Sequence, residues 1–249
     1  MARFDGKRVL ITGGTSGIGL ATAKRIADEG GTVAVTGTSQ EHLDEAKEAL
    51  PEGTLVLKND ARDPEAAKAL AKTVKEEMGG LDGLYLNAGF GKFWDTEEIE
   101  ADDFDKIMDV NVRGPVLQMA ALKPMLNDDG AVLLTSSVAG YLGQAEGAVY
   151  GATKIACYAL ARSWASDLAP KGIRVNAVAP GPIDTRFFAG TGMDEQKQDE
   201  FVEQVKQAVP LGRVGTAEEV AGVTCFLLSD DASYVTGSEY FVDGGMTKR

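Results

Sequence analysis

Tyr150 and Lys154 lie four residues apart in the segment YGATK, which otherwise contains only small residues. On a helix, side chains at positions i and i+4 project from the same face, so the phenol and the ammonium group would be neighbours. A free phenol loses its proton at about pH 10, roughly three units above neutrality, and a nearby cation favours the phenolate. The pair is therefore a candidate general acid and base. A structural tyrosine beside a solvated lysine is the simpler alternative for the pair taken alone.

Histidine and cysteine, which often carry acid–base and metal chemistry, are scarce in this chain. His42 is the only histidine, and no G-x-S-x-G segment accompanies it, which argues against hydrolysis by a Ser-His-Asp triad. Histidine-rich metal sites are excluded, and no metal site is predicted. Because His42 follows Gln40 and Glu41 at the start of a helical pattern, we expect it at the surface. Cys157 and Cys225 each lie in an apolar helical pattern and are expected to be buried thiols.

A glycine-rich segment at 12–19, TGGTSGIG, has the spacing of a dinucleotide-binding loop. It follows a buried strand pattern and opens a helical pattern, which is the setting that such a loop requires. Its glycines permit a tight turn and a close backbone approach to a pyrophosphate, and the helix N-terminus adds amide donors. No Gly-Lys-Ser/Thr follows, so the segment is not a P-loop. The residues predicted to contact a cofactor here are Gly13, Thr15, Ser16, Gly17, Ile18 and Gly19.

These motifs need a scaffold, and the rest of the sequence indicates which one. Short β-rich runs alternate with helical patterns, as in the βαβ units of a parallel sheet. The expected strands cover 8–13, 32–37, 54–60, 81–89, 131–137, 174–181 and 239–245. The expected helices cover 17–29, 42–50, a segment opened by Asp63-Pro64, a long stretch ending near Leu126, 150–169, and a segment with a capping box at Thr216 and Glu219 that ends near Leu228. The sequence therefore predicts an α/β protein, a three-layer doubly wound Rossmann fold whose parallel sheet has about seven strands with helices on both faces, in a single domain over residues 1–249.

Six motifs, taken together and in order, resemble the short-chain dehydrogenase/reductase family over essentially the whole chain. They are TGGTSGIG at 12–19, NAG at 87–89, Asn111, Ser137, Tyr150-x-x-x-Lys154 and PG at 180–181. The glycine positions match the compact oxidoreductase branch, whereas the extended branch would place a glycine where Ser16 stands and would be longer. The resemblance implies an NAD(P)(H)-dependent alcohol dehydrogenase or ketone reductase that passes a hydride between nicotinamide and a carbonyl carbon.

The resemblance also implies a role for each catalytic residue. Tyr150 donates a proton in reduction and accepts one in oxidation, assisted by Lys154, which also bonds the nicotinamide ribose. Ser137 holds the substrate oxygen, and Asn111 orders a water in a proton relay from the lysine to solvent. Neighbouring Ser136 is expected to face the other way. Further cofactor contacts are expected from Asp60 and Ala61 at the adenine, from Asn87, Ala88 and Gly89 along the cofactor, from Tyr150 and Lys154, and from Pro180, Gly181, Ile183 and Thr185 beside the nicotinamide amide.

The choice between the two nicotinamide cofactors depends on the end of the second strand. A carboxylate there bonds the ribose diol and repels a 2′-phosphate, but the residue at this position is Gly37, followed by Thr38 and Ser39. No arginine follows, and Ser16 stands where many NADP-dependent relatives carry a basic residue. The hydroxyl groups of Thr38 and Ser39 could bond either the ribose diol of NAD(H) or the 2′-phosphate of NADP(H). The missing carboxylate favours NADP(H), with NAD(H) as the alternative.

The substrate pocket is expected between 137–144, 90–94 and the segment after Gly181. Candidate lining residues are Phe90, Phe93, Trp94, Tyr141, Leu142, Phe187 and Phe188. If these side chains face the substrate, an apolar or aryl ketone and its secondary alcohol fit better than a sugar phosphate. The polar, glycine-containing segment 184–200 could be a lid or an ordinary exposed loop.

Charge and composition limit the partners. The net charge of −13 argues against binding to nucleic acid or to an anionic membrane. No apolar run reaches the roughly 18 residues of a membrane span, and the charged N-terminus does not resemble a signal peptide, so a cytoplasmic protein is expected. The resemblance implies a homotetramer. Two alternatives remain: a 3-oxoacyl carrier-protein reductase, against which the acidic charge argues, and a dinucleotide-binding protein without catalysis.

Overall fold

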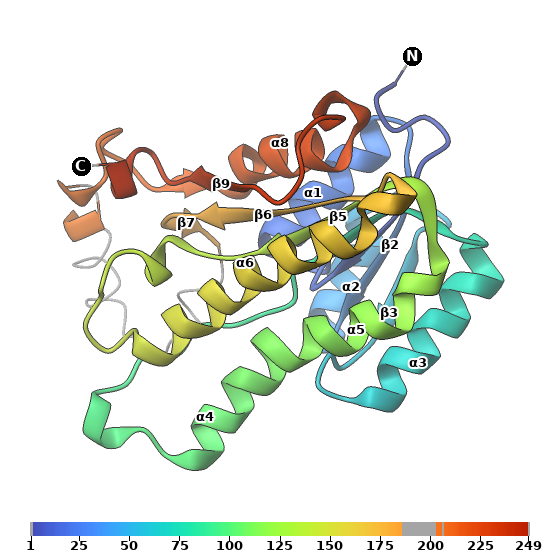
Figure 1. The fold of residues 1–249 in the computed structure, drawn as a ribbon. Helices are drawn as coiled ribbons and strands as arrows, with labels where there is room; N and C mark the ends of the chain where they lie inside the picture. The colour runs from blue at the N-terminus through green and yellow to red at the C-terminus, as the bar shows by residue number, and fades with distance from the viewer. Residues whose placement is uncertain (1, 186–202, 206, 249) are drawn as a thin grey trace.

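The computed structural model describes residues 2–185, 203–205 and 207–248. At its centre is a seven-stranded sheet in the order β3-β2-β1-β4-β5-β6-β9, and each neighbouring pair of strands is parallel. The strands are β1 (Arg8–Thr12), β2 (Thr32–Gly37), β3 (Leu55–Lys58), β4 (Leu81–Leu86), β5 (Leu126–Thr135), β6 (Arg174–Pro180) and β9 (Glu239–Val242) (Figure 1). The predicted doubly wound fold is confirmed.

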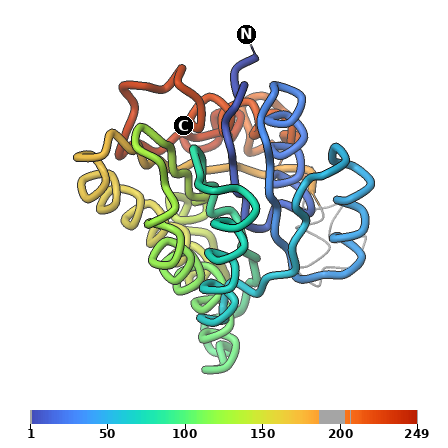
Figure 2. Tube along the Cα trace, turned by 90° about the vertical axis from the view of Figure 1, so that its right-hand side faces the viewer, coloured from blue at the N-terminus to red at the C-terminus, as the bar shows by residue number. Residues whose placement is uncertain are grey.

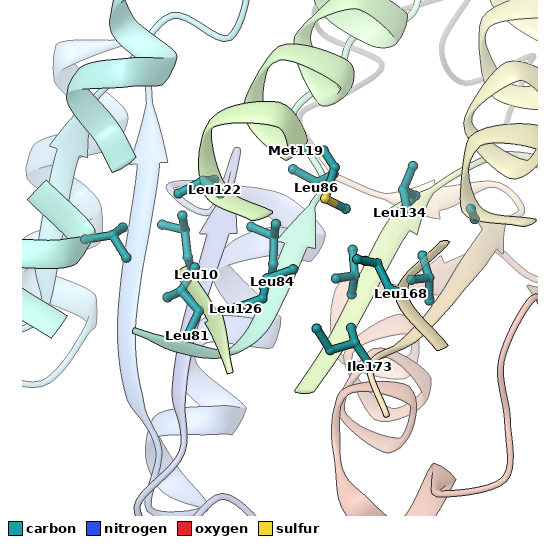
Figure 3. Close-up of a cluster of buried hydrophobic side chains, with 14 of the residues drawn as sticks. Leu10, Leu81, Leu84, Leu86, Met119, Leu122, Leu126, Leu134, Leu168 and Ile173 are labelled. Carbon is teal, nitrogen blue, oxygen red and sulfur yellow. The ribbon is translucent and has the colours of Figure 1, made fainter. Parts of the chain in front are cut away.

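Helices cover both faces of the sheet (Figures 1 and 2). One face is packed by α1 (Gly17–Asp28), α2 (Gln40–Ala49) and α8 (Ala217–Leu228), and the other by α3 (Pro64–Thr73), α5 (Gly114–Leu122) and α6 (Ala148–Leu168). Leucines dominate the second of these layers, where Leu84 of β4 and Leu122 of α5 belong to one buried cluster (Figure 3). Since both faces of the strands are covered, the central strands are almost continuously apolar.

Two elements differ from the sequence prediction by more than a few residues. Strand β5 begins at Leu126, because Leu126 pairs with Leu81 ahead of a shift in register. The polar residues NDD at 127–129 follow Leu126, so the hydrophobic pattern of the sequence did not predict this part of the strand. The helical stretch expected to run unbroken to Leu126 is divided into α4 (Ala101–Met108), a π-helical turn (Asp109–Arg113), α5 and a 3₁₀ turn (Lys123–Met125).

Local sequence explains where several helices begin. The Asp63 carboxylate accepts a hydrogen bond from the amide of Glu65 at 2.8 Å, and Pro64 occupies the first turn of α3. At α8, Thr216 and Glu219 form the predicted capping box. Within the described part of the chain, no helix is both long enough and apolar enough to cross a membrane.

Candidate active site

A cavity of about 980 Å³ lies at the carboxyl ends of the central strands. In the sheet order, β1 and β4 are neighbours where the chain reverses its direction of winding, and ligands of open α/β sheets bind at such a point. Segments that follow β1, β2, β3, β4, β5 and β6 all contribute to the cavity wall. The volume is large enough for an extended ligand with two different ends.

Three of the four predicted catalytic residues line this cavity: Ser137, Tyr150 and Lys154. The Lys154 Nζ lies 5.7 Å from the centre of the Tyr150 ring and donates a hydrogen bond to the Thr135 carbonyl at 3.2 Å. Both residues come from α6 and are buried, so the phenol and the ammonium group face the same restricted space. Ser137 follows β5, where its hydroxyl accepts a hydrogen bond from the Ala139 amide at 3.2 Å.

The hydroxyl of the preceding residue, Ser136, is used elsewhere. It hydrogen-bonds the Val178 carbonyl at 3.1 Å and the Glu239 carboxylate. Although Ser136 also borders the cavity, its hydroxyl is held by β6 and β9. Ser137 is therefore the better placed of the two serines to meet a substrate.

Asn111, the fourth predicted catalytic residue, is 1% exposed and lies behind the cavity wall. Its side chain accepts from the Phe90 amide at 3.0 Å and donates to the Phe90 carbonyl at 2.9 Å. Its backbone carbonyl lacks the usual helical partner because Pro115, four residues later, has no N–H, and the Cys157 thiol donates to it at 3.2 Å. The structure thus gives Asn111 a positioning contact to the 90–94 loop, and its predicted role in a water relay stays a prediction.

The glycine loop has the shape of a cradle for a dinucleotide. A Cβ atom at Gly13 would lie 2.8 Å from Ala88 Cα, and one at Gly19 would lie 2.3 Å from the Gly13 carbonyl oxygen. Glycine at these positions lets the loop close against the segment after β4. The start of α1, with its unsatisfied first amides, opens toward the cavity at Ser16 and Gly17. These residues fit the pyrophosphate of a nicotinamide cofactor. Gly19 itself is not among the lining residues and serves the packing of the loop.

At the far end of this cradle, Thr15 occupies the space that a side chain at position 37 would need. A Cβ atom at Gly37 would lie 2.3 Å from Thr15 Oγ1. The cavity here is also lined by Thr38, Ser39, Asp60 and Ala61, as predicted, and by two residues that sequence reasoning missed, His42 and Arg62. His42 was expected at the surface, but it is half-buried, because α2 begins at Gln40 and turns it toward the cavity.

Arg62 is tied to the predicted adenine contact. Its guanidinium donates two hydrogen bonds to the Asp60 carboxylate at 2.6 Å and 3.0 Å. These hydrogen bonds hold the pKa of the Asp60 carboxyl below its usual range, so the group is ionised at neutral pH. The negative charge of Asp60 therefore neutralises the positive charge of Arg62.

The remaining predicted cofactor contacts also border the cavity. They are Asn87, Ala88 and Gly89 after β4, and Pro180, Gly181, Ile183 and Thr185 after β6. A Cβ atom at Gly181 would lie 2.7 Å from Asp243 Cα, which brings the two segments into contact. Asp243 accepts from the backbone of Gly245 and Thr247, and the short turn that it stabilises carries Met246 into the cavity wall.

The end of the cavity beyond Tyr150 is mainly apolar. Of the predicted substrate contacts, Phe90, Phe93 and Leu142 line it, and Phe187 and Phe188 lie outside the described residues. Two predictions were wrong. Trp94 is buried beside Ile107 and its indole donates to Asp103 at 3.2 Å, and Tyr141 packs its ring against Phe241 while its hydroxyl donates to Glu239.

Several lining residues had no sequence signal. They are Lys106, Val110, Gln204, Val205, Ala208 and Met246. They lie in helical turns or in the C-terminal turn, outside the motifs that the sequence analysis used. Among the described residues, no group of three or more His, Cys, Asp or Glu side chains is arranged to hold a metal ion.

Comparisons with known proteins find relatives that match nearly the whole chain. A family profile described as enoyl-(acyl carrier protein) reductase matches residues 13–247. Levodione reductase of Leifsonia aquatica is 36% identical over 98% of this chain and 96% of its own length. The 3-oxoacyl-acyl-carrier-protein reductase FabG of Thermotoga maritima is also 36% identical, over 98% of this chain and 99% of its own length.

Solved structures give the same result. Crystalline levodione reductase superimposes with a TM-score of 0.92 at 36% identity, covering 99% of both chains. A short-chain dehydrogenase/reductase from Serratia marcescens superimposes with a TM-score of 0.90 at 34% identity, covering 98% of this chain and 99% of its own. A blue fluorescent protein from a metagenomic library, solved in complex with NADPH, reaches 0.89 at 30% identity, covering 98% of this chain and 99% of its own.

Proposed function

This chain belongs to the short-chain dehydrogenase/reductase family of oxidoreductases, and we propose that within it the protein transfers a hydride between a nicotinamide cofactor and an apolar ketone or the matching secondary alcohol. One observation carries the proposal. Tyr150, Lys154 and Ser137 share a cavity whose one end is the glycine cradle and whose other end is walled by Phe90, Phe93 and other apolar groups.

The bound nicotinamide would supply and accept the hydride. Gly13 to Ile18 would hold its pyrophosphate, and the segments at 87–89 and 180–185 would flank its ribose and amide. The protein's own residues handle the proton. In reduction the Tyr150 hydroxyl donates a proton to the substrate oxygen, and in oxidation the phenolate takes it back. Lys154 places its ammonium group beside the Tyr150 ring, within the same cavity.

Ser137 would fix the substrate oxygen within reach of Tyr150, since the two hydroxyl groups face the same cavity. The Phe93 ring meets the Tyr150 ring edge-on at a centroid distance of 5.7 Å and so restricts the position of the phenol. Burial of this group of residues keeps water away from the reacting atoms.

For the cofactor, we propose NADP(H), with NAD(H) as the alternative. The steric conflict between a side chain at position 37 and Thr15 supports this choice, because the carboxylate that selects NAD has no room there. The solved NADPH complex of a protein with the same fold is consistent with it.

A second candidate is a 3-oxoacyl carrier-protein reductase, which the similarity to FabG favours. We further propose a single-domain homotetramer in the cytoplasm. The buried free thiols Cys157 and Cys225 are compatible with a reducing compartment. Light scattering in solution would test the assembly.

The decisive experiment is a panel of ketones and secondary alcohols assayed with both cofactors, following the absorbance of the reduced nicotinamide. We expect turnover of apolar or aryl ketones, faster with NADPH than with NADH. Binding of a cofactor without hydride transfer to any member of the panel would instead favour a non-catalytic dinucleotide-binding protein.

A further inference from the structure

A chain of hydrogen bonds connects a fully buried tyrosine in the sheet to the glycine loop. The Thr135 hydroxyl, at the end of β5, lies 2.8 Å from the Tyr85 hydroxyl of β4 and 2.9 Å from Asn87 Oδ1. Asn87 Nδ2 then donates to the Gly13 carbonyl at 3.0 Å. The chain therefore passes from the interior of the sheet to the first glycine of the loop.

The donors in this chain have one consistent direction. A threonine hydroxyl carries one proton, and an amide oxygen only accepts, so Thr135 donates to Asn87 Oδ1. The Tyr85 hydroxyl must then donate to Thr135. Burial raises the pKa of the Tyr85 phenol, which keeps its proton available at neutral pH. Each group thus orients the next.

The end of this chain lies in the tightest part of the loop. A Cβ atom at Gly19 would lie 2.8 Å from Asn87 Nδ2, and one at Gly13 would lie 3.3 Å from it. The amide thus sits between Gly13 and Gly19 of the cradle. Rotation of this amide would bring its oxygen toward the Gly13 carbonyl, where two acceptors repel each other.

Thr135 contacts the catalytic group separately, through its backbone. Its carbonyl accepts the hydrogen bond from Lys154 Nζ, and this contact does not depend on the side chain. A substitution at position 135 can therefore disturb the cofactor cradle while the lysine keeps its acceptor.

We propose that Thr135 and Tyr85 are positioning residues for the cofactor, which hold the Asn87 amide against the glycine loop. The inference rests on the proposed function, since it assumes that the loop binds a dinucleotide. Neither residue belongs to the motifs by which the chain resembles its family.

The test compares Thr135→Val, which keeps the shape and removes the donor, with Thr135→Ser, which keeps the hydroxyl. NADPH and NADH binding are titrated by nicotinamide fluorescence. We expect the Kd of Thr135→Val to rise about threefold to tenfold, the typical effect of one lost hydrogen bond. At saturating cofactor its kcat should stay within about twofold of the original, and Thr135→Ser should bind nearly as tightly as the original protein.

A raised Kd could also come from a general loss of structure. The double variant Tyr85→Phe with Thr135→Val distinguishes that explanation from a loss of positioning. Thr135→Val leaves a buried phenol without its partner, whereas the double variant removes both polar groups and should recover melting temperature. Its cofactor Kd should stay raised, because Asn87 still lacks its donor. The double variant also carries the test if Thr135→Val alone fails to fold.

Two outcomes would overturn the inference: an unchanged Kd in Thr135→Val, or a Kd that recovers together with the melting temperature in the double variant. If the original protein binds neither NADPH nor NADH, the proposed function itself fails, and this inference fails with it. The titration of the original protein therefore distinguishes the two failures.

Discussion

Replacing Tyr150 by phenylalanine removes one oxygen from the candidate site and keeps the ring that packs against Phe93. If the phenol is the proton carrier, turnover should fall by about a hundredfold to ten-thousandfold and be effectively abolished. Cofactor binding should survive, because the glycine cradle is untouched. Steady-state assays and cofactor titration of Tyr150→Phe check both parts.

The matched control is Tyr158→Phe, which removes a phenol from the same helix. Tyr158 packs against the buried cluster on the α6 side of the sheet, and the Arg162 guanidinium lies over its ring. It is not among the residues that line the cavity. It should keep its turnover. Substantial residual activity in Tyr150→Phe, measured beside this control, would remove the role assigned to the catalytic tyrosine.

Position 37 provides a test of cofactor choice at the level of two side chains. Gly37→Asp alone should weaken the binding of both cofactors, because its Cβ would meet Thr15 Oγ1. With Thr15→Gly in addition, the aspartate gains room to bond the ribose diol and repel a 2′-phosphate. We expect this pair of substitutions to favour NADH over NADPH. Cofactor titrations of the single and double variants measure it, and equal binding of Gly37→Asp and the original protein would exclude the conflict.

Sequence reasoning succeeded for residues in local motifs and failed where tertiary contacts decide. Tyr150, Lys154 and the glycine loop carry their geometry in their spacing, so they could be placed at one cavity. Tyr141 could not, since its direction depends on Glu239, which is 98 residues away. His42 was misplaced because the sequence did not indicate which way the first turn of α2 would face.

At the scale of elements, the division between α4 and α5 was the main feature that hydrophobic periodicity did not predict. Apolar residues continue through the region, but Pro115 lacks the N–H that would bond the Asn111 carbonyl, and a π-helical turn results. The seven strands were predictable because each is a short apolar run between turn residues, whereas the polar start of β5 was not.

The capping box of α8 gives a prediction for stability against pH. Hydrogen bonds from Arg213 and from the Thr216 amide lower the pKa of the Glu219 carboxyl to about 2, from 4.5. Because the folded pKa is depressed, the contribution of Glu219 is present above about pH 4.5 and is lost as the pH falls toward about 2. We expect Glu219→Gln to lower the midpoint of urea unfolding at neutral pH, and the difference to shrink through that acidic range.

Glu218→Gln is the control, since it removes the same charge from the same turn and keeps the capping box. Its midpoint should stay closer to that of the original protein at neutral pH. A constant difference between Glu219→Gln and the original protein at all pH values would mean that the ionised carboxylate does not act through this cap.

At the scale of the whole molecule, the fold brings the cradle and the apolar pocket to the two ends of one cavity, while the net charge of −13 sets what can approach it. A neutral ketone is neither attracted nor repelled by that net charge. An acidic carrier protein is repelled, and the repulsion is screened over about 10 Å at 0.1 M salt. The two candidate functions therefore respond differently to ionic strength.

We expect the kcat/KM for a 3-oxoacyl group on its carrier protein to lie below that for the same acyl group on a small neutral thioester, with the gap narrowing as salt is added. The small thioester should be almost insensitive to salt and serves as the control. Assays of both substrates at low and at physiological ionic strength measure the effect. A preference for the carrier-bound substrate at low salt would require a basic docking site on this acidic protein, and would replace the ketone reductase by the carrier-protein reductase as its function.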